Sequence, residues 1–389
     1  MVSLFQTRRK SLRLLAMSAA LGVLAACSTG LPGGPRVNTS APIPVALLVP
    51  GGSETDGDNL LAQSLENAAR LAMADLDGVT IDLRVYNTAG QAPQAAIVAR
   101  QAVNDGAKII LGPVFAEASN AAGLAVANRG VNVLSFSNNP AIAGGNVFVM
   151  GPTFQNSANR LVQYAIANGR SNIQIIHATD GSETAGRDAI QNAIVRNGAN
   201  LAGTSGFDLT QQGVIDAIPQ IVQDVRTSGA DTVFLTSGTS GALPFLAQLL
   251  PENGLDPTET QYLGLQRWDI PASAVTLAGL QGGWFARPDP ALATLFSDRY
   301  NSAFGGSPHP IAGLAYDGIA AIGALVAQGR GDALTGEALT QSAGFSGVNG
   351  VFRLLADGTN ERGLTISQIT DNQVSVIDPA PRSFGAAGF

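Results

Sequence analysis

Along the chain, short apolar runs alternate repeatedly with longer amphipathic stretches, and this alternation limits the possible folds to a few. The runs have the length of strands buried on both faces, and the stretches repeat their apolar residues with helical period. The expected strands are Ile43–Val49, Val79–Tyr86, Lys108–Leu111, Val131–Phe136 and Val147–Met150, then Ile173–His177, Leu201–Phe207, Thr232–Thr236 and Tyr262–Leu265. The expected helices include Leu60–Asp75, Pro93–Asn104 and Glu117–Asn128. The pattern predicts an α/β protein of two doubly wound lobes, each with a central parallel sheet.

Composition excludes several classes of function. The 389 residues carry a net charge of −7 and include only two lysines, so no basic stripe is available for nucleic acid. One cysteine and two histidines leave no disulfide framework and no metal ligand set. No serine-hydrolase elbow or phosphate-binding loop occurs. We therefore expect no enzyme, cofactor or metal; wall hydrolysis by paired carboxylates such as Asp180 with Glu183 is a distant alternative.

Residues 1–26 have the pattern of an export signal. Four basic residues precede the apolar run Leu14–Ala26, which is too short to span a membrane but suits a signal peptide. Removing this segment takes four positive and no negative charges, so the mature net charge would be −11. The basic segment Thr7–Arg13 also resembles a twin-arginine signal, so both export routes stay open.

The end of the signal resembles the lipobox of bacterial lipoproteins, with Leu24, Ala25 and Ala26 before Cys27. Cys27 is the only cysteine, so we expect lipidation there. Residues 27–42, rich in Gly, Pro, Ser and Thr, would form a flexible tether. The expected location is the periplasm, with a lipid anchor in a bacterial membrane and the outer membrane favoured.

The order of motifs over residues 43–377 resembles the type I periplasmic binding proteins, the leucine/isoleucine/valine-binding branch. The matching segments are 109–113 with Ser119, 133–140, 315–318 and 350–358. The resemblance implies a three-crossing hinge between lobe 1 (43–150 plus 283–340) and lobe 2 (151–282 plus 341–377), with 378–389 as a C-terminal tail. The late strands Val351–Leu355 and Leu364–Ile369 would then return to lobe 2.

Some residues depart from the amino-acid receptors of this family. Ala116 stands where those receptors have a carboxylate-binding serine, and no aromatic residue occurs in the loop after His177. Segments 112–116, 135–138, 265–269 and 282–286 look more like the penicillin-binding-protein activators, which are envelope lipoproteins. We therefore expect a non-enzymatic lipoprotein acting through a cleft ligand or a peptidoglycan-synthase partner. The alternative is the solute-binding lipoprotein of an ABC importer, with its permease as partner, for branched-chain amino acids or similar small polar ligands.

A cleft ligand would contact the loops that follow the strands, because such folds bind ligands at the carboxyl ends of the strands. For each tryptophan, packing in the core is the alternative to ligand contact. The expected ligand-binding residues are Ser53, Phe115, Ser137, Asn138, Asn139, Asp180, Trp268 and Asp269.

Overall fold

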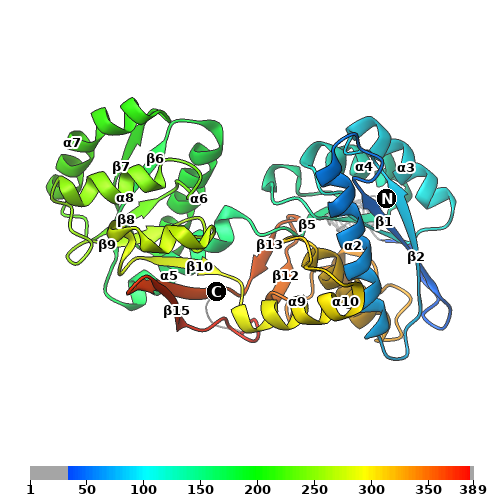
Figure 1. The fold of residues 1–389 in the computed structure, drawn as a ribbon. Helices are drawn as coiled ribbons and strands as arrows, with labels where there is room; N and C mark the ends of the chain where they lie inside the picture. The colour runs from blue at the N-terminus through cyan, green and yellow to red at the C-terminus, as the bar shows by residue number, and fades with distance from the viewer. Residues whose placement is uncertain (1–33, 386–389) are drawn as a thin grey trace, which may run out of the picture.

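The computed structural model describes residues 34–385 as two α/β lobes (Figure 1). The predicted signal peptide, Cys27 and the first part of the tether lie outside these residues. No helix within residues 34–385 is long and apolar enough to cross a membrane.

Lobe 1 is built on a five-stranded parallel sheet of order β2-β1-β3-β4-β5. Its strands are β1 (Ile43–Val49), β2 (Ile81–Asn87), β3 (Ile109–Leu111), β4 (Asn132–Ser135) and β5 (Val147–Val149). Helices cover both faces: α2 (Asp56–Ala74), α9 (Pro290–Phe304) and α10 (Gly313–Val326) on one, and α3 (Ala92–Asn104) and α4 (Ala116–Val126) on the other. A short helix, α11 (Gly336–Leu339), completes the lobe.

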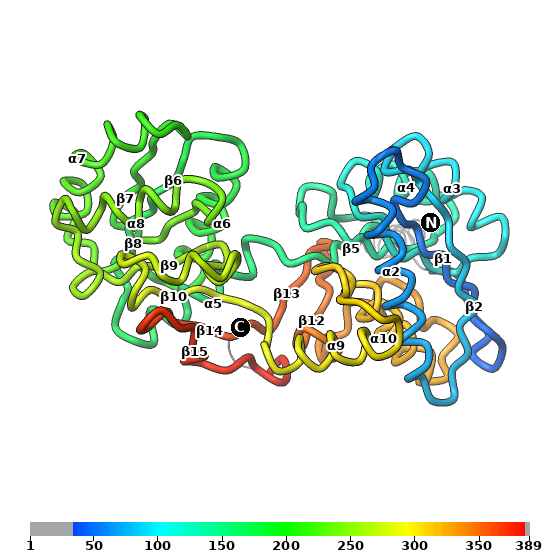
Figure 2. The backbone as a smooth tube through the Cα atoms, viewed as in Figure 1, coloured from blue at the N-terminus to red at the C-terminus, as the bar shows by residue number. Residues whose placement is uncertain are grey.

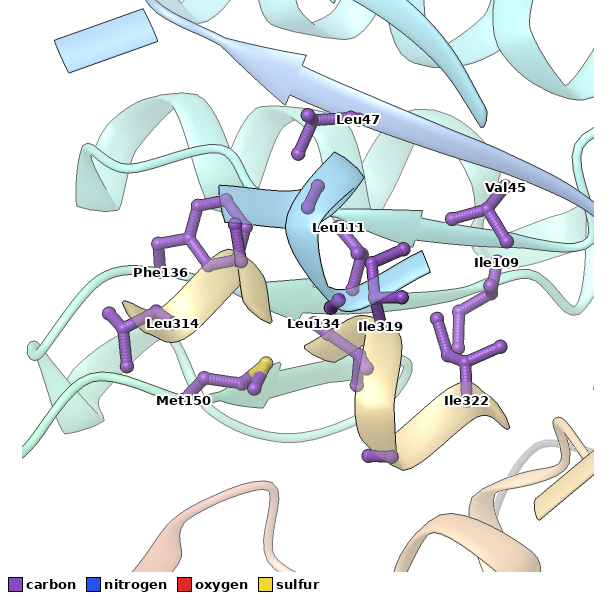
Figure 3. Close-up of a cluster of buried hydrophobic side chains, with 14 of the residues drawn as sticks. Val45, Leu47, Ile109, Leu111, Leu134, Phe136, Met150, Leu314, Ile319 and Ile322 are labelled. Carbon is purple, nitrogen blue, oxygen red and sulfur yellow. The ribbon is translucent and has the colours of Figure 1, made fainter. Parts of the chain in front are cut away.

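Strand side chains of lobe 1 alternate between two apolar layers, as the unbroken apolar runs predict. Leu47, Leu111 and Leu134 point toward Ile319 and Ile322 of α10 (Figure 3). Each of these five side chains is fully buried, and burial of one such side chain stabilises the fold by about 1.5–3 kcal/mol.

Lobe 2 is built on a seven-stranded sheet of order β15-β14-β10-β9-β8-β6-β7. Its parallel strands are β6 (Asn172–Ala178), β7 (Asn200–Phe207), β8 (Thr232–Leu235), β9 (Gln261–Gly264) and β10 (Trp284–Arg287), and β14 (Thr365–Thr370) and β15 (Gln373–Asp378) add an antiparallel edge. Helices α5 (Phe154–Ala167) and α6 (Gly181–Asn197) cover one face, and α7 (Gln211–Ser228) and α8 (Leu243–Glu252) cover the other. The expected fold class, two lobes with largely parallel central sheets, is confirmed.

The expected lobe boundary at residue 283 is wrong, because β10 belongs to lobe 2. It pairs with β9 in parallel and with β14 in antiparallel. Trp284 and Ala286 enter the apolar layer under α5 and α6, while Phe285 enters the opposite layer. A strand buried on both faces needs a central place in a sheet, and lobe 2 supplies it.

The expected return to lobe 2 at residue 341 is also wrong. Strands β11 (Phe345–Gly347), β12 (Gly350–Leu354) and β13 (Asn360–Arg362) form a separate antiparallel sheet. Phe345 and Phe352 bury their rings in the core of lobe 1, so β12 stays with lobe 1. The chain returns to lobe 2 only with β14.

Three short segments cross between the lobes, at residues 150–153, 288–289 and 363–364 (Figure 2). They follow strands β5, β10 and β13, respectively. These three crossings form the hinge.

Hydrogen bonds join the chain segments of lobe 1 that lead into the first and third crossings, and we call these two the paired crossings. The backbone N–H of Val149 donates to the carbonyl of Gly358 at 2.8 Å. The side-chain amide of Asn360 donates to the carbonyls of Val149 and Gly151 at 2.8 and 2.9 Å. The two crossings therefore leave lobe 1 side by side, and of these bonds the one from Asn360 to Gly151 reaches into the first crossing.

Candidate functional site

The predicted ligand residues of lobe 1 do lie at the carboxyl ends of its strands, but their polar groups are largely used locally. Ser53 Oγ donates to Asp58 at 2.8 Å. Ser137 is buried, and its Oγ accepts from the backbone of Asn139 at 3.1 Å. Asn138 is exposed, and Phe115 leaves 39% of its surface exposed just before α4. The loop geometry thus leaves Asn138 and Phe115 available to a ligand.

Asp180 begins α6 as its N-cap. Its side chain accepts from the backbone N–H of Glu183 at 2.8 Å and from Ser182 Oγ at 3.1 Å. An N-cap carboxylate satisfies a helix N–H that has no partner within the helix. The structure therefore gives Asp180 a structural role.

Replacing Asp180 with alanine is expected to lower the free energy of unfolding by about 1 kcal/mol, because the cap is lost. Asn is an equally good cap, so Asp180→Asn is the matched control and should retain stability. Urea denaturation of both variants checks this. Unchanged stability in Asp180→Ala, together with weaker solute binding, would return Asp180 to the ligand site.

Glu183 lies fully inside this edge of lobe 2 and ties three loops together. Its Oε2 accepts from the backbone N–H of Ala178 at 2.9 Å, Thr236 Oγ1 at 2.8 Å and Ser237 Oγ at 2.7 Å. The carboxylate therefore fixes the carboxyl ends of β6 and β8 to the first turn of α6.

The assignment of Trp268 to the ligand site is wrong, because its side chain is fully buried in the core of lobe 2. The indole lies over Gly264 and Gly283, where an added Cβ would stand 2.2 and 2.4 Å from ring atoms. Phe285 packs beside it at 6.2 Å between ring centres. Because neither glycine has a side chain, the indole has room to pack inside the core.

Asp269, the next residue, lies between two arginines. Its carboxylate contacts Arg267 and Arg287, each at 2.8 Å. Burial would raise the pKa of Asp269, but hydrogen bonds and charges from both arginines outweigh burial and hold this pKa below its usual value. The trio is therefore one carboxylate and two guanidiniums, with a net charge of +1.

A pocket of about 560 Å³ lies at the hinge beside this trio, and we call it the hinge pocket. Lobe 2 contributes Gln266 and Arg287, while lobe 1 contributes Phe296 and Leu314. Its volume lies in the range of small-molecule sites. None of the eight predicted ligand residues lines it, although Asp269 holds two residues that do.

The arginines at the hinge pocket are the residues that the sequence analysis missed as site residues. Arg267 lies in the loop after β9 and Arg287 is the last residue of β10, so strand-end reasoning could have found both. Arg362 ends β13, a strand that the sequence did not predict, and residues 341–377 were expected in lobe 2.

Arg362 is also the centre of the hinge itself. Its guanidinium donates to the carbonyl of Met150 in the first crossing, and it lies 3.6 Å from Asp317 of α10. Burial raises the pKa of Asp317 to about 6, against the opposing charge of Arg362. The pair thus connects lobe 1 to both paired crossings.

Within residues 34–385, no group of three or more His, Cys, Asp or Glu side chains is placed to hold a metal ion.

Comparison with known proteins shows what this arrangement of lobes is similar to. A family model described as "Periplasmic binding protein" matches residues 42–373. No curated protein sequence matches the chain.

Several solved structures share the fold at low sequence identity. One, from Rhodospirillum rubrum, is assigned to branched-chain amino acid ABC transport; identity is 18%, coverage 87% of this chain and 100% of the other, and the TM-score 0.72. An ABC transporter substrate-binding protein from Desulfitobacterium hafniense in complex with Leu shows 18% identity, coverage of 87% and 100%, and a TM-score of 0.61. A solute-binding protein from Rhodopseudomonas palustris in complex with 3,4-dihydroxybenzoic acid shows 17% identity, coverage of 89% and 98%, and a TM-score of 0.56.

Proposed function

The chain belongs to the periplasmic binding protein family, and from this premise we propose that it captures a small solute between its lobes for an ABC importer. Proteins of this family bind solutes and are generally not enzymes, and the family implies a periplasmic location. The observation that carries the proposal is the hinge pocket, which takes side chains from both lobes. A solute held there would favour one arrangement of the lobes, and a permease can recognise that arrangement.

This proposal corresponds to the alternative expected from the sequence, the solute-binding protein of an ABC importer. The solved structures described above are of transporter solute-binding proteins, which favours capture of a solute for import over activation of a peptidoglycan synthase. Lipid anchoring at Cys27 and the outer membrane remain predictions, as does the synthase partner. Branched-chain amino acids are one candidate solute class, by likeness to the named relatives.

Filling the hinge pocket should weaken solute binding without unfolding the chain. Ala293 of α9 lines the pocket and is partly exposed, whereas Ala291 on the same helix is exposed and does not line it. We expect Ala293→Trp to weaken binding at least about tenfold, a loss of 1.4 kcal/mol or more, while Ala291→Trp binds as the parent does. Calorimetric titration measures both.

The solute itself is first found by thermal shift, using amino acids, carboxylic acids and neutral sugars. A solute at 1,000 times its dissociation constant adds about 4 kcal/mol of stability, which raises the melting temperature by several degrees. If no compound of the three classes raised the melting temperature, the proposal would be contradicted. The next experiment would then be a pull-down of peptidoglycan synthases.

A further inference from the structure

The charges around the hinge pocket are uneven. Arg267, Arg287 and Arg362 line it, and none of its lining side chains is an aspartate or glutamate. Asp269 lies behind the first two arginines and balances one of them, while Asp317 pairs with Arg362. Among the lining side chains and their ion-pair partners, one positive charge is left in excess, although the whole chain has a net charge of −7.

Both arginines beside Asp269 keep N–H groups for another partner. Arg287 donates through Nε to Ser367 at 2.8 Å and through Nη1 to Asp269, and its Nη2 has no hydrogen bond within the described part of the chain. Arg267 donates to Asp269 through Nε and Nη2, and its Nη1 is likewise unused among residues 34–385. Guanidinium groups with free N–H donors match a carboxylate well.

Three helices begin at the pocket, and two of them add to its positive character. The first residues of α5, α9 and α10, which are Phe154, Pro290 and Gly313, all line it. A helix amino end carries partial positive charge from its unpaired N–H groups. The carboxylate of Asp289 caps α9 and accepts from the backbone N–H groups of Ala291 and Leu292. Only the amino ends of α5 and α10, which have no acidic cap, therefore reinforce the preference for an anion.

The rest of the lining is largely apolar. Pro152, Phe154, Pro288, Ile311 and Leu314 contribute apolar surface from both lobes. A ligand that fills this space must bring apolar surface of its own to gain from burial.

We propose that the hinge pocket holds a small monocarboxylic acid that has a branched or aromatic apolar body and lacks an ammonium group. The inference rests on the proposed function, because it names the class of solute that the site takes. An ammonium group would lose its water beside an excess positive charge, with no carboxylate in the lining to pair with it. A zwitterionic amino acid of the same shape is therefore disfavoured.

Three compounds with one carbon skeleton test the inference: 4-methylpentanoate, leucine and 4-methylpentan-1-ol. We expect calorimetric titration to show 4-methylpentanoate binding at least about tenfold tighter than either of the others. Benzoate and benzyl alcohol form a second matched pair. Leucine binding as tightly as the acid, or the alcohol doing so, would overturn the inference.

Three variants identify the charge that is responsible. Arg267→Gln leaves Asp269 paired with Arg287 and should weaken acid binding about tenfold. Asp269→Asn releases both arginines and should tighten it, a result opposite to that for a ligand-binding carboxylate. Arg330→Gln, on an exposed ion pair with Asp332, should bind as the parent does. Melting curves show which variants are folded. If Asp269→Asn does not fold, the result for Arg267→Gln alone tests the inference.

The outcomes separate the two proposals. Leucine binding with no response to acids, or acid binding unaffected by Arg267→Gln, overturns the inference and leaves solute capture in place. No response to any acid, amino acid or sugar overturns both.

Discussion

Replacing Arg362 with alanine is expected to lower the free energy of unfolding by about 3–5 kcal/mol. The guanidinium is buried, donates to the carbonyl of Met150 and lies 3.6 Å from Asp317. Its removal would leave a fully buried carboxylate without a cation and the carbonyl without its side-chain donor. Urea denaturation, with circular dichroism as the readout, measures the change.

An exposed ion pair supplies the control for Arg362. Arg330 contacts Asp332 at 2.8 Å with both side chains about half exposed or more, so Arg330→Ala should cost less than about 1 kcal/mol. Removing both buried charges together, with Arg362→Met and Asp317→Asn, should restore part of the loss. Equal losses for Arg362→Ala and Arg330→Ala would contradict the role given to Arg362.

The second large effect is expected for Glu183→Ala, at about 3 kcal/mol or more. One carboxylate oxygen accepts three hydrogen bonds, from Ala178, Thr236 and Ser237. All three donors are buried, so alanine would leave each without this acceptor. The same denaturation measurement applies.

Glu183→Gln is the matched control, because its amide oxygen can still accept from the same donors. We expect it to retain at least half of the stability lost in Glu183→Ala, since its hydrogen bonds lack the charge. If alanine and glutamine cost the same small amount, the network does not hold the loops.

Local periodicity predicts most of the strands and helices. The predicted strand Ile43–Val49 is observed with the same bounds, and the helix predicted at 93–104 is observed at Ala92–Asn104. Both signals are contained in a few consecutive residues, because strand and helix periods act over short distances.

Sheet membership was harder to predict, since it depends on distant partners. The four residues of β10 have no alternation that says which sheet they join, and their neighbours β9 and β14 lie far apart in sequence. The resemblance to a family supplied the number of crossings but placed two of them wrongly. Burial of Phe285 and Phe352 in different lobes settles these positions.

The candidate site was predicted only in part, for a similar reason. Loops at the carboxyl ends of the strands were identified, yet the hinge pocket is closed by Arg267, Arg287 and Arg362 from three separate segments. The sequence shows where arginines occur along the chain, but it does not show toward which part of the fold their unused N–H groups are directed. Gly264 and Gly283 leave room for the indole of Trp268, but only the structure shows that both glycines face it.

The paired crossings form a double connection between the lobes. Sliding one crossing along the other would break the bonds that Asn360 and Arg362 make to the carbonyls of Gly151 and Met150 in the first crossing. The single crossing at 288–289 moves with the paired crossings. These bonds oppose sliding of the two crossings, so we expect the lobes to close on a captured solute by bending of both crossings together.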